Sequence, residues 1–249
     1  MGNKRLMALV LFFFSYLTLC LSVPTKSLVS LSNQTPRRLS FARSLTSAHQ
    51  GGLVKRVDAK YQQFANDLET ATMVDQDAEQ FLPFGAAPAI FASHGFQGCI
   101  GVAIVSSQGA IIAHYTNAAS AMNQARTQLP NLITNNIDAL AGAKAWIYAH
   151  VSLSDTDTYT SETNNKVLED IVKTNLHIVP ARVKYIEPED MLVDEQDELL
   201  DPDQYPEDLL YGAIMIKHQA GQSAGADVIF INLDWQKAAA ENSKPQPSS

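Results

Sequence analysis

The stretch Cys99–Thr116 reads CIGVAIVSSQGAIIAHYT, and its pattern decides the fold of this chain. Two short apolar runs rich in Ile, Val and Ala, 100–105 and 110–116, flank the polar turn Ser106–Gly109. Such runs, separated by a turn that contains Gly, are typical of a β-hairpin. The sequence therefore predicts two antiparallel strands, with Cys99 just before the first and His114 on the second.

Periodic segments on both sides of this hairpin predict further helices and strands. Apolar residues at helical spacing mark the segments 57–73, 117–141 and 161–176. Short apolar runs predict strands at 89–91, 144–152, 178–186, 211–217 and 228–233, the last two joined as a second hairpin. Polar, Pro-rich and Gly-rich composition predicts loops at 81–88 and 154–163, and Pro130 predicts a break or kink. This order predicts an α+β fold, a mixed and mostly antiparallel β-sheet or sandwich flanked by helices.

The N-terminal residues have the pattern of targeting and processing segments. A basic start followed by the apolar run 6–21 predicts a signal peptide cut near Ser22. Residues 23–56 are rich in Ser, Thr, Lys and Arg, and they end in Lys55 and Arg56, a pair that resembles a kexin-type processing site. A chance pair in a flexible arm is the alternative. We expect a secreted, extracellular protein with a signal peptide, a propeptide, one domain and a disordered tail, at 1–22, 23–56, 57–242 and 243–249.

Charge is divided unevenly between the leader and the rest of the chain. Residues before Val57 hold eight of the 18 Lys and Arg and none of the 26 Asp and Glu. An acidic domain repels phosphate backbones, so we expect no nucleic-acid partner. No stretch after the leader is apolar for long enough to cross a bilayer, so we expect no membrane insertion of the mature form. The His and acidic residues show no metal-ligand spacing, so we expect no metal site.

Cys99 is the only cysteine outside the predicted signal peptide. A lone thiol in a secreted protein suggests intermolecular pairing or a reactive group, and a buried structural Cys is the alternative. Side chains alternate faces along a strand, so an even-length loop places Cys99 and His114 on one face of the hairpin. If Val105 pairs with Ala110, Gly101 lies opposite His114 and leaves open space beneath its ring, with Cys99 as the diagonal neighbour.

These residue types suit nucleophilic catalysis. A thiolate is a nucleophile, and a nearby imidazole lowers its pKa and later donates a proton. The turn before Cys99 offers backbone N–H groups for an oxyanion, with Gln97, Gly98 and His94 as candidate oxyanion or substrate contacts. Ser93, His94 and backbone carbonyls are candidates for the group that orients His114.

The run from Ser93 through Gly98 and Cys99 into a strand, a turn and His114 resembles the Cys–His glutamine deamidase superfamily. Its members include the chemotaxis receptor deamidase CheD, the cytotoxic necrotizing factor toxins and the Burkholderia lethal factor. Two of these have Thr six residues before the Cys, where this chain has Ser93. The resemblance implies their fold, and catalysis by Cys99, His114 and Ser93 without a cofactor. It also implies hydrolysis of a glutamine side chain on a protein substrate through a thioester. Phe96 and Gln97 depart from the Leu-Ser or Leu-Gly that the family favours.

Two other functions remain open. One is a non-catalytic secreted binding module, in which the acidic segment 187–208 engages a protein partner and Cys99 is structural. The other is a different thiol hydrolase, such as an amidase or a transglutaminase-like enzyme. The leading hypothesis is a secreted, effector-like or toxin-like cysteine hydrolase that deamidates protein glutamine.

Overall fold

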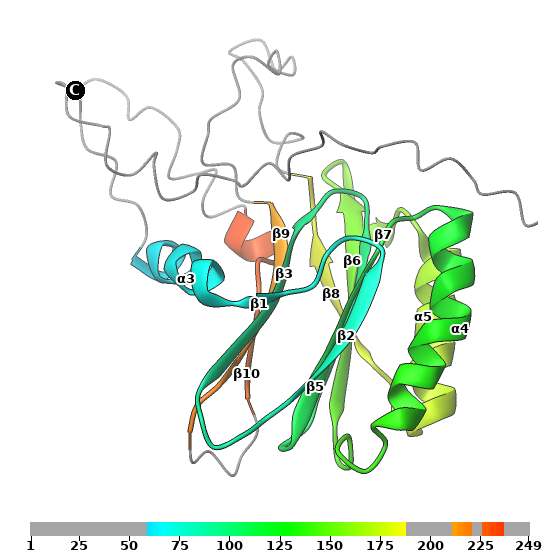
Figure 1. Cartoon of the computed structure of the whole chain (residues 1–249). Helices are drawn as coiled ribbons and strands as arrows, with labels where there is room; N and C mark the ends of the chain where they lie inside the picture. The colour runs from blue at the N-terminus through cyan, green and yellow to red at the C-terminus, as the bar shows by residue number, and fades with distance from the viewer. Residues whose placement is uncertain (1–58, 188–210, 221–225, 237–249) are drawn as a thin grey trace, which may run out of the picture. The chain divides into compact units, whose positions relative to one another are not determined.

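The structure is a computed structural model, and it describes residues 59–187, 211–220 and 226–236. These residues form two mostly antiparallel β-sheets flanked by helices (Figure 1), so the predicted α+β class is confirmed. The predicted signal peptide, the propeptide with Lys55 and Arg56, the tail, and the acidic segment after Glu187 lie outside the described residues. Within the part of the chain that is described, no helix has both the length and the apolar character needed to cross a membrane.

The larger sheet, called sheet B here, is built around the predicted hairpin. Its strand order is β2–β5–β4–β6–β7, with β8 beside β6. The bounds are β2 Ala78–Pro83, β4 Ile100–Val105, β5 Gly109–Tyr115, β6 Lys144–Ser152, β7 Asp155–Tyr159 and β8 Ala181–Tyr185. Every residue of β4 and β5 is buried, because other layers cover both faces of these central strands. Their continuous apolar runs are therefore explained by two-sided burial.

The register of the hairpin is the predicted one. Val105 lies opposite Ala110 and Gly101 lies opposite His114. The connecting turn is closed by the Ser106 hydroxyl, which accepts from the backbone N–H groups of Gln108 and Gly109. The predicted pairing of these two strands is confirmed.

The smaller sheet, sheet A, has the order β1–β3–β9–β10. Its strands are β1 Thr72–Met73, β3 Ala89–Phe96, β9 Gly212–His218 and β10 Asp227–Phe230. The antiparallel pairing of β9 with β10 confirms the second hairpin, although its connection, 221–225, lies outside the described residues. Strand β3 is longer than the sequence predicts and carries Ser93 and His94 within the sheet.

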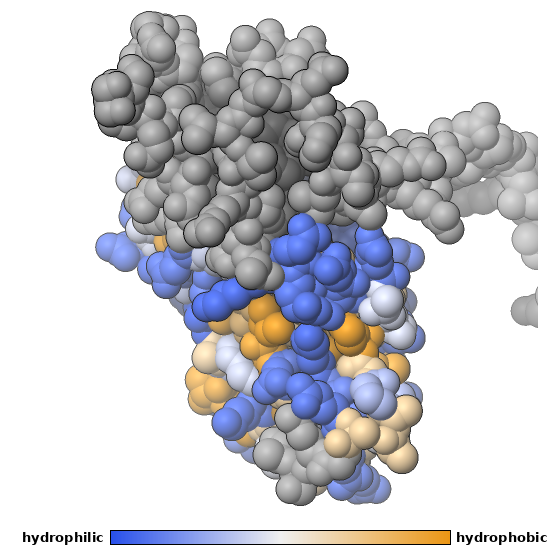
Figure 2. All heavy atoms as spheres, turned by 90° about the vertical axis from the view of Figure 1, so that its left-hand side faces the viewer, coloured by the Kyte–Doolittle hydropathy of each residue, from blue (hydrophilic) through white to orange (hydrophobic). Residues whose placement is uncertain are grey.

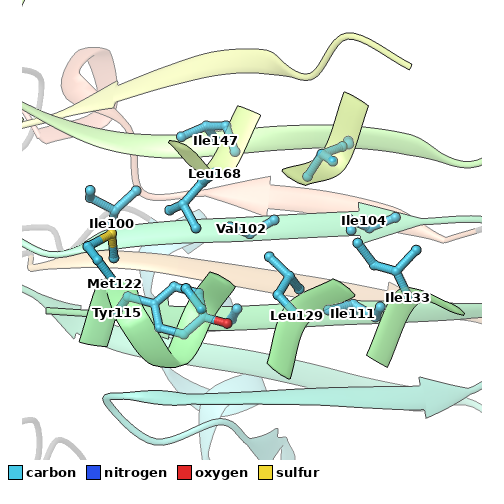
Figure 3. Packing of buried hydrophobic residues seen from close by; sticks show 14 of the residues in the cluster. Ile100, Val102, Ile104, Ile111, Tyr115, Met122, Leu129, Ile133, Ile147 and Leu168 are labelled. Atoms are coloured by element: carbon cyan, nitrogen blue, oxygen red, sulfur yellow. The ribbon is translucent and has the colours of Figure 1, made fainter. Parts of the chain in front are cut away.

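Side-chain clusters show how the layers pack. Helices α4 (Ala119–Asn135) and α5 (Glu162–Leu176) cover one face of sheet B, where their apolar stripes meet β4, β5 and β6 (Figure 3). A second cluster fills the space between the two sheets. Helix α3 (Ala59–Thr70) packs Phe64 on the other face of sheet A. Figure 2 views the molecule from that side and shows hydrophobic surface between hydrophilic residues.

Two predicted loops are wrong in part, and the helix that contains Pro130 does not break there. Residues 81–83 belong to β2. Proline is tolerated at position 83 because β2 is an edge strand, so the missing backbone N–H removes no hydrogen bond on the unpaired side of the strand. Part of 154–163 forms β7, a polar edge strand beside the end of β6. Helix α4 runs through Pro130, held by Leu129 and Ile133, which are fully buried in the core.

Candidate active site at Cys99 and His114

Cys99 and His114 lie on the face of sheet B that looks toward sheet A. Cys99 directly precedes β4 and packs in the cluster between the sheets, beside Phe96 and Tyr185. His114 is on β5, two residues after Ile112, which belongs to the same cluster. Alternation along the strand therefore points His114 into the same layer as Cys99. Both side chains are buried, with Cys99 5% exposed and His114 2% exposed.

Ser93 joins the two sheets through His114. Its Oγ lies 2.8 Å from the carbonyl oxygen of Val74 and 2.9 Å from Nδ1 of His114. A carbonyl only accepts, so the single hydroxyl proton goes to Val74, and the Ser93 oxygen accepts from Nδ1–H of His114. This arrangement selects the tautomer that leaves Nε2 of His114 with its lone pair.

The charge state of His114 follows from its surroundings. Burial lowers the pKa of His114 to about 4, while Asp77 acts to raise that pKa and His94 acts to lower it further. The imidazole is therefore neutral near pH 7. Its Nε2 is buried and has no hydrogen-bond partner among the described residues. An unpaired acceptor in a buried site is costly, and it marks Nε2 as the atom available for a proton.

Phe96 fills the space that the sequence predicts to be open. Its ring stacks on His114 with centroids 3.7 Å apart and planes within 12°. A Cβ on Gly101 would lie 2.9 Å from Cε1 of Phe96 and 2.6 Å from Cδ1 of Ile214. The expectation of open space beneath the His114 ring is therefore wrong: glycine at 101 admits the Phe96 ring.

The Cys99 thiol is protonated in this arrangement. Burial raises the pKa of Cys99; a backbone hydrogen bond to Gln97 opposes this, and the carboxylates of Asp77 and Glu187 raise that pKa further. Sγ donates to the carbonyl oxygen of Gln97 at 3.4 Å. Because Nε2 of His114 has no partner, the thiol and this imidazole are not hydrogen-bonded to each other.

The turn between β3 and β4 carries the other predicted residues. Gly95 and Gly98 have φ of 75° and 62°, values that favour glycine, and Gly95 forms a bulge in the pairing of β3 with β9. Gln97 is exposed and Gly98 is half-buried. His94 is half-buried, and burial lowers its pKa against the opposing charge of Asp75. The structure thus brings the turn and His94 to the same end of the molecule as Cys99.

Two positioning contacts have no signal in the sequence pattern. The hydroxyl of Tyr185, on β8, donates to the carbonyl oxygen of Cys99 at 2.7 Å. The carboxylate of Asp77 accepts from the backbone N–H and the hydroxyl of Thr116, which follows His114 by two residues. Both partners are distant in the sequence, so strand periodicity could not have identified them.

The geometry can support a proton transfer and a nucleophilic attack after a rearrangement. His114 is oriented by Ser93 and presents the lone pair of Nε2, and Cys99 supplies a thiol on the same face. No group of three or more His, Cys, Asp or Glu within the described residues could hold a metal ion. No model of a known protein family matches this chain, and no curated protein sequence matches it.

Proposed function

We propose that this chain is a secreted, cysteine-dependent hydrolase of side-chain amides, with protein glutamine as its substrate. The observation that carries the proposal is the bond from His114 to Ser93, which leaves Nε2 as an unpaired buried acceptor on the face that holds Cys99. A nucleophile, a base and a group that orients the base are the parts that thiol hydrolysis requires. The resemblance to the Cys–His deamidases and the predicted leader support the choice of substrate and of a secreted enzyme.

The reaction proceeds in two steps. The Cys99 thiol leaves the Gln97 carbonyl, gives its proton to Nε2 of His114, and attacks the side-chain carbonyl carbon of the substrate glutamine. The carbon–nitrogen bond then breaks, and ammonia leaves with the proton from His114, so that a thioester remains on Cys99. Water attacks the thioester, its proton passes through His114, and the carbon–sulfur bond breaks to give glutamate and the free enzyme.

The turn contributes to both steps. We assign the backbone N–H groups of Gly98 and Cys99, which adjoin the thiol in the sequence, to the negative oxygen of the tetrahedral intermediate. Cys99 is 5% exposed, so the turn at Gln97 must move to admit a substrate. His94 and the exposed Gln97 then line the entrance on the substrate side.

Ammonia release tests the proposal directly. We expect the protein to release ammonia from glutamine-containing peptides and proteins and to convert glutamine to glutamate, which mass spectrometry detects. Cys99→Ser should abolish this activity. Ser93→Ala should reduce kcat by about 10- to 100-fold, because the His114 tautomer is no longer selected. His177→Asn, at the exposed end of α5, is the matched control and should retain full activity.

A non-catalytic binding module is the second candidate. The raised pKa of Cys99 and its bond to the Gln97 carbonyl are properties of a structural cysteine. In that case wild type and Cys99→Ser release equally little ammonia across a broad panel of protein substrates. That result would exclude the hydrolase and leave a protein partner as the ligand.

A further inference from the structure

His150 lies on β6, the strand that pairs with β4 directly after Cys99, and its place near the end of that strand suggests no function. In the pairing of β4 with β6, Gly101 lies opposite Tyr148 and Ile100 lies opposite Ala149. One step further along the same antiparallel register places Cys99 opposite His150. Side chains at directly opposed positions share a face and are close neighbours. Cys99 therefore has His114 on one side in sheet B and His150 on the other.

Contacts of Glu187 support this placement independently of the register. Its Oε1 lies 4.0 Å from Nε2 of His150. The same oxygen lies 3.1 Å from the position that a Cβ on Gly98 would occupy. One carboxylate oxygen thus contacts the residue before Cys99 and approaches the imidazole of His150.

Tyr185 connects the same two residues. Its hydroxyl donates to the carbonyl oxygen of Cys99, and its ring centroid lies 5.4 Å from that of His150. It is also the register partner of His150 in the pairing of β8 with β6. Register, carboxylate and tyrosine together place His150 at the Cys99 site.

The ring of His150 is held much as the ring of His114 is. Its Nδ1 lies 3.0 Å from Oγ1 of Thr160, and that hydroxyl donates to the carbonyl oxygen of His150. The hydroxyl proton is thus used, so Nδ1–H donates to Thr160, and Nε2, which approaches Glu187, is the nitrogen that gains or loses a proton. With a proton on Nε2, His150 and Glu187 form an ion pair.

We propose that His150 is a second histidine of the Cys99 site, and that its imidazolium, held by Glu187, stabilises the thiolate that Cys99 forms when it reacts. The carboxylates of Glu187 and Asp77 both disfavour a negative charge on Cys99. The other nearby polar groups add no positive charge: they are the neutral ring of His114 and the hydroxyls of Tyr148 and Tyr185. A positively charged imidazolium between Glu187 and Cys99 offsets the repulsion between these carboxylates and the thiolate. The proposal rests on the proposed function only in taking Cys99 as the reactive group.

Alkylation of Cys99 tests the proposal without any substrate. The rate of carboxamidomethylation by iodoacetamide is followed on the full chain by mass spectrometry of the peptide that contains Cys99. We expect His150→Gln to lower the rate about tenfold near pH 7 and to leave it unchanged at high pH, where the thiol ionises without help. His177→Asn is the control and should follow the wild type. If His150 has a purely structural role, His150→Gln changes the alkylation rate at every pH, and this result would overturn the proposal. A dependence of the rate on pH equal to that of the wild type would overturn it as well.

A second measurement decides the matter if His150→Gln does not fold. In the His114→Asn variant, the alkylation rate should still rise at a lower pH than that of an unassisted thiol, because the imidazolium of His150 remains to stabilise the thiolate. A rate that rises only in the range of an unassisted thiol would refute the role of His150. Ammonia release tests the deamidase hypothesis and alkylation of Cys99 tests the role of His150, so either proposal can fail in its own measurement while the other stands.

Discussion

Acid should destabilise this protein through His114. The folded state holds the pKa of His114 at about 4, whereas an unfolded chain has a histidine pKa of about 6.5. The unfolded chain therefore binds a proton first as the pH falls. The neutral buried imidazole makes its full contribution to the free energy of unfolding above pH 6.5, and this contribution is lost as the pH falls from 6.5 to about 4. Each pKa unit corresponds to about 1.4 kcal/mol, so this window should cost about 3 kcal/mol of the free energy of unfolding.

Urea unfolding at pH 7 and pH 4 measures this cost. The wild type should lose about 3 kcal/mol more between these two pH values than His114→Gln does, because glutamine does not titrate. The comparison is needed because other groups also contribute to the pH dependence, including His94, whose pKa is lowered by burial. If the wild type and His114→Gln have the same pH dependence, burial does not hold the imidazole neutral, and the argument for a neutral His114 with an available lone pair on Nε2 fails.

Two further substitutions test the packing around the site and in the helical layer. Gly101→Ala should lower the free energy of unfolding by about 1–3 kcal/mol in urea, because its methyl group meets Phe96 and Ile214. It should also displace the Phe96 ring and shift the NMR titration of His114, and an unchanged titration would count against the stacked arrangement. Asn165→Leu should raise the free energy of unfolding by about 1 kcal/mol, because Asn165 is fully buried on α5 and neither side-chain amide atom has a hydrogen-bond partner among the described residues. A lower urea midpoint for this variant would show that the amide is satisfied in solution.

Much of the fold could be predicted from the sequence because the relevant signals are local. The β4–β5 hairpin, its register, and the opposing positions of Gly101 and His114 follow from alternation and from the length of one turn. Helices α4 and α5 follow from the spacing of apolar residues that all face sheet B. The failures at β2 and β7 are edge strands, where pairing on one side only allows Pro and polar residues that otherwise indicate loops.

The sequence alone determined that Cys99 and His114 share one face if the turn between their strands has an even length, because a strand has a period of two; the pairing of Val105 with Ala110 in the structure meets this condition. Only the tertiary structure decided what surrounds them. Ser93 reaches His114 from the other sheet, and Phe96 occupies the space above Gly101. We infer that His150 faces Cys99 from β6, which is distant in sequence and adjacent in the sheet. Periodicity within one strand fixes where a side chain points, whereas pairing between strands and packing between sheets select which distant groups it meets.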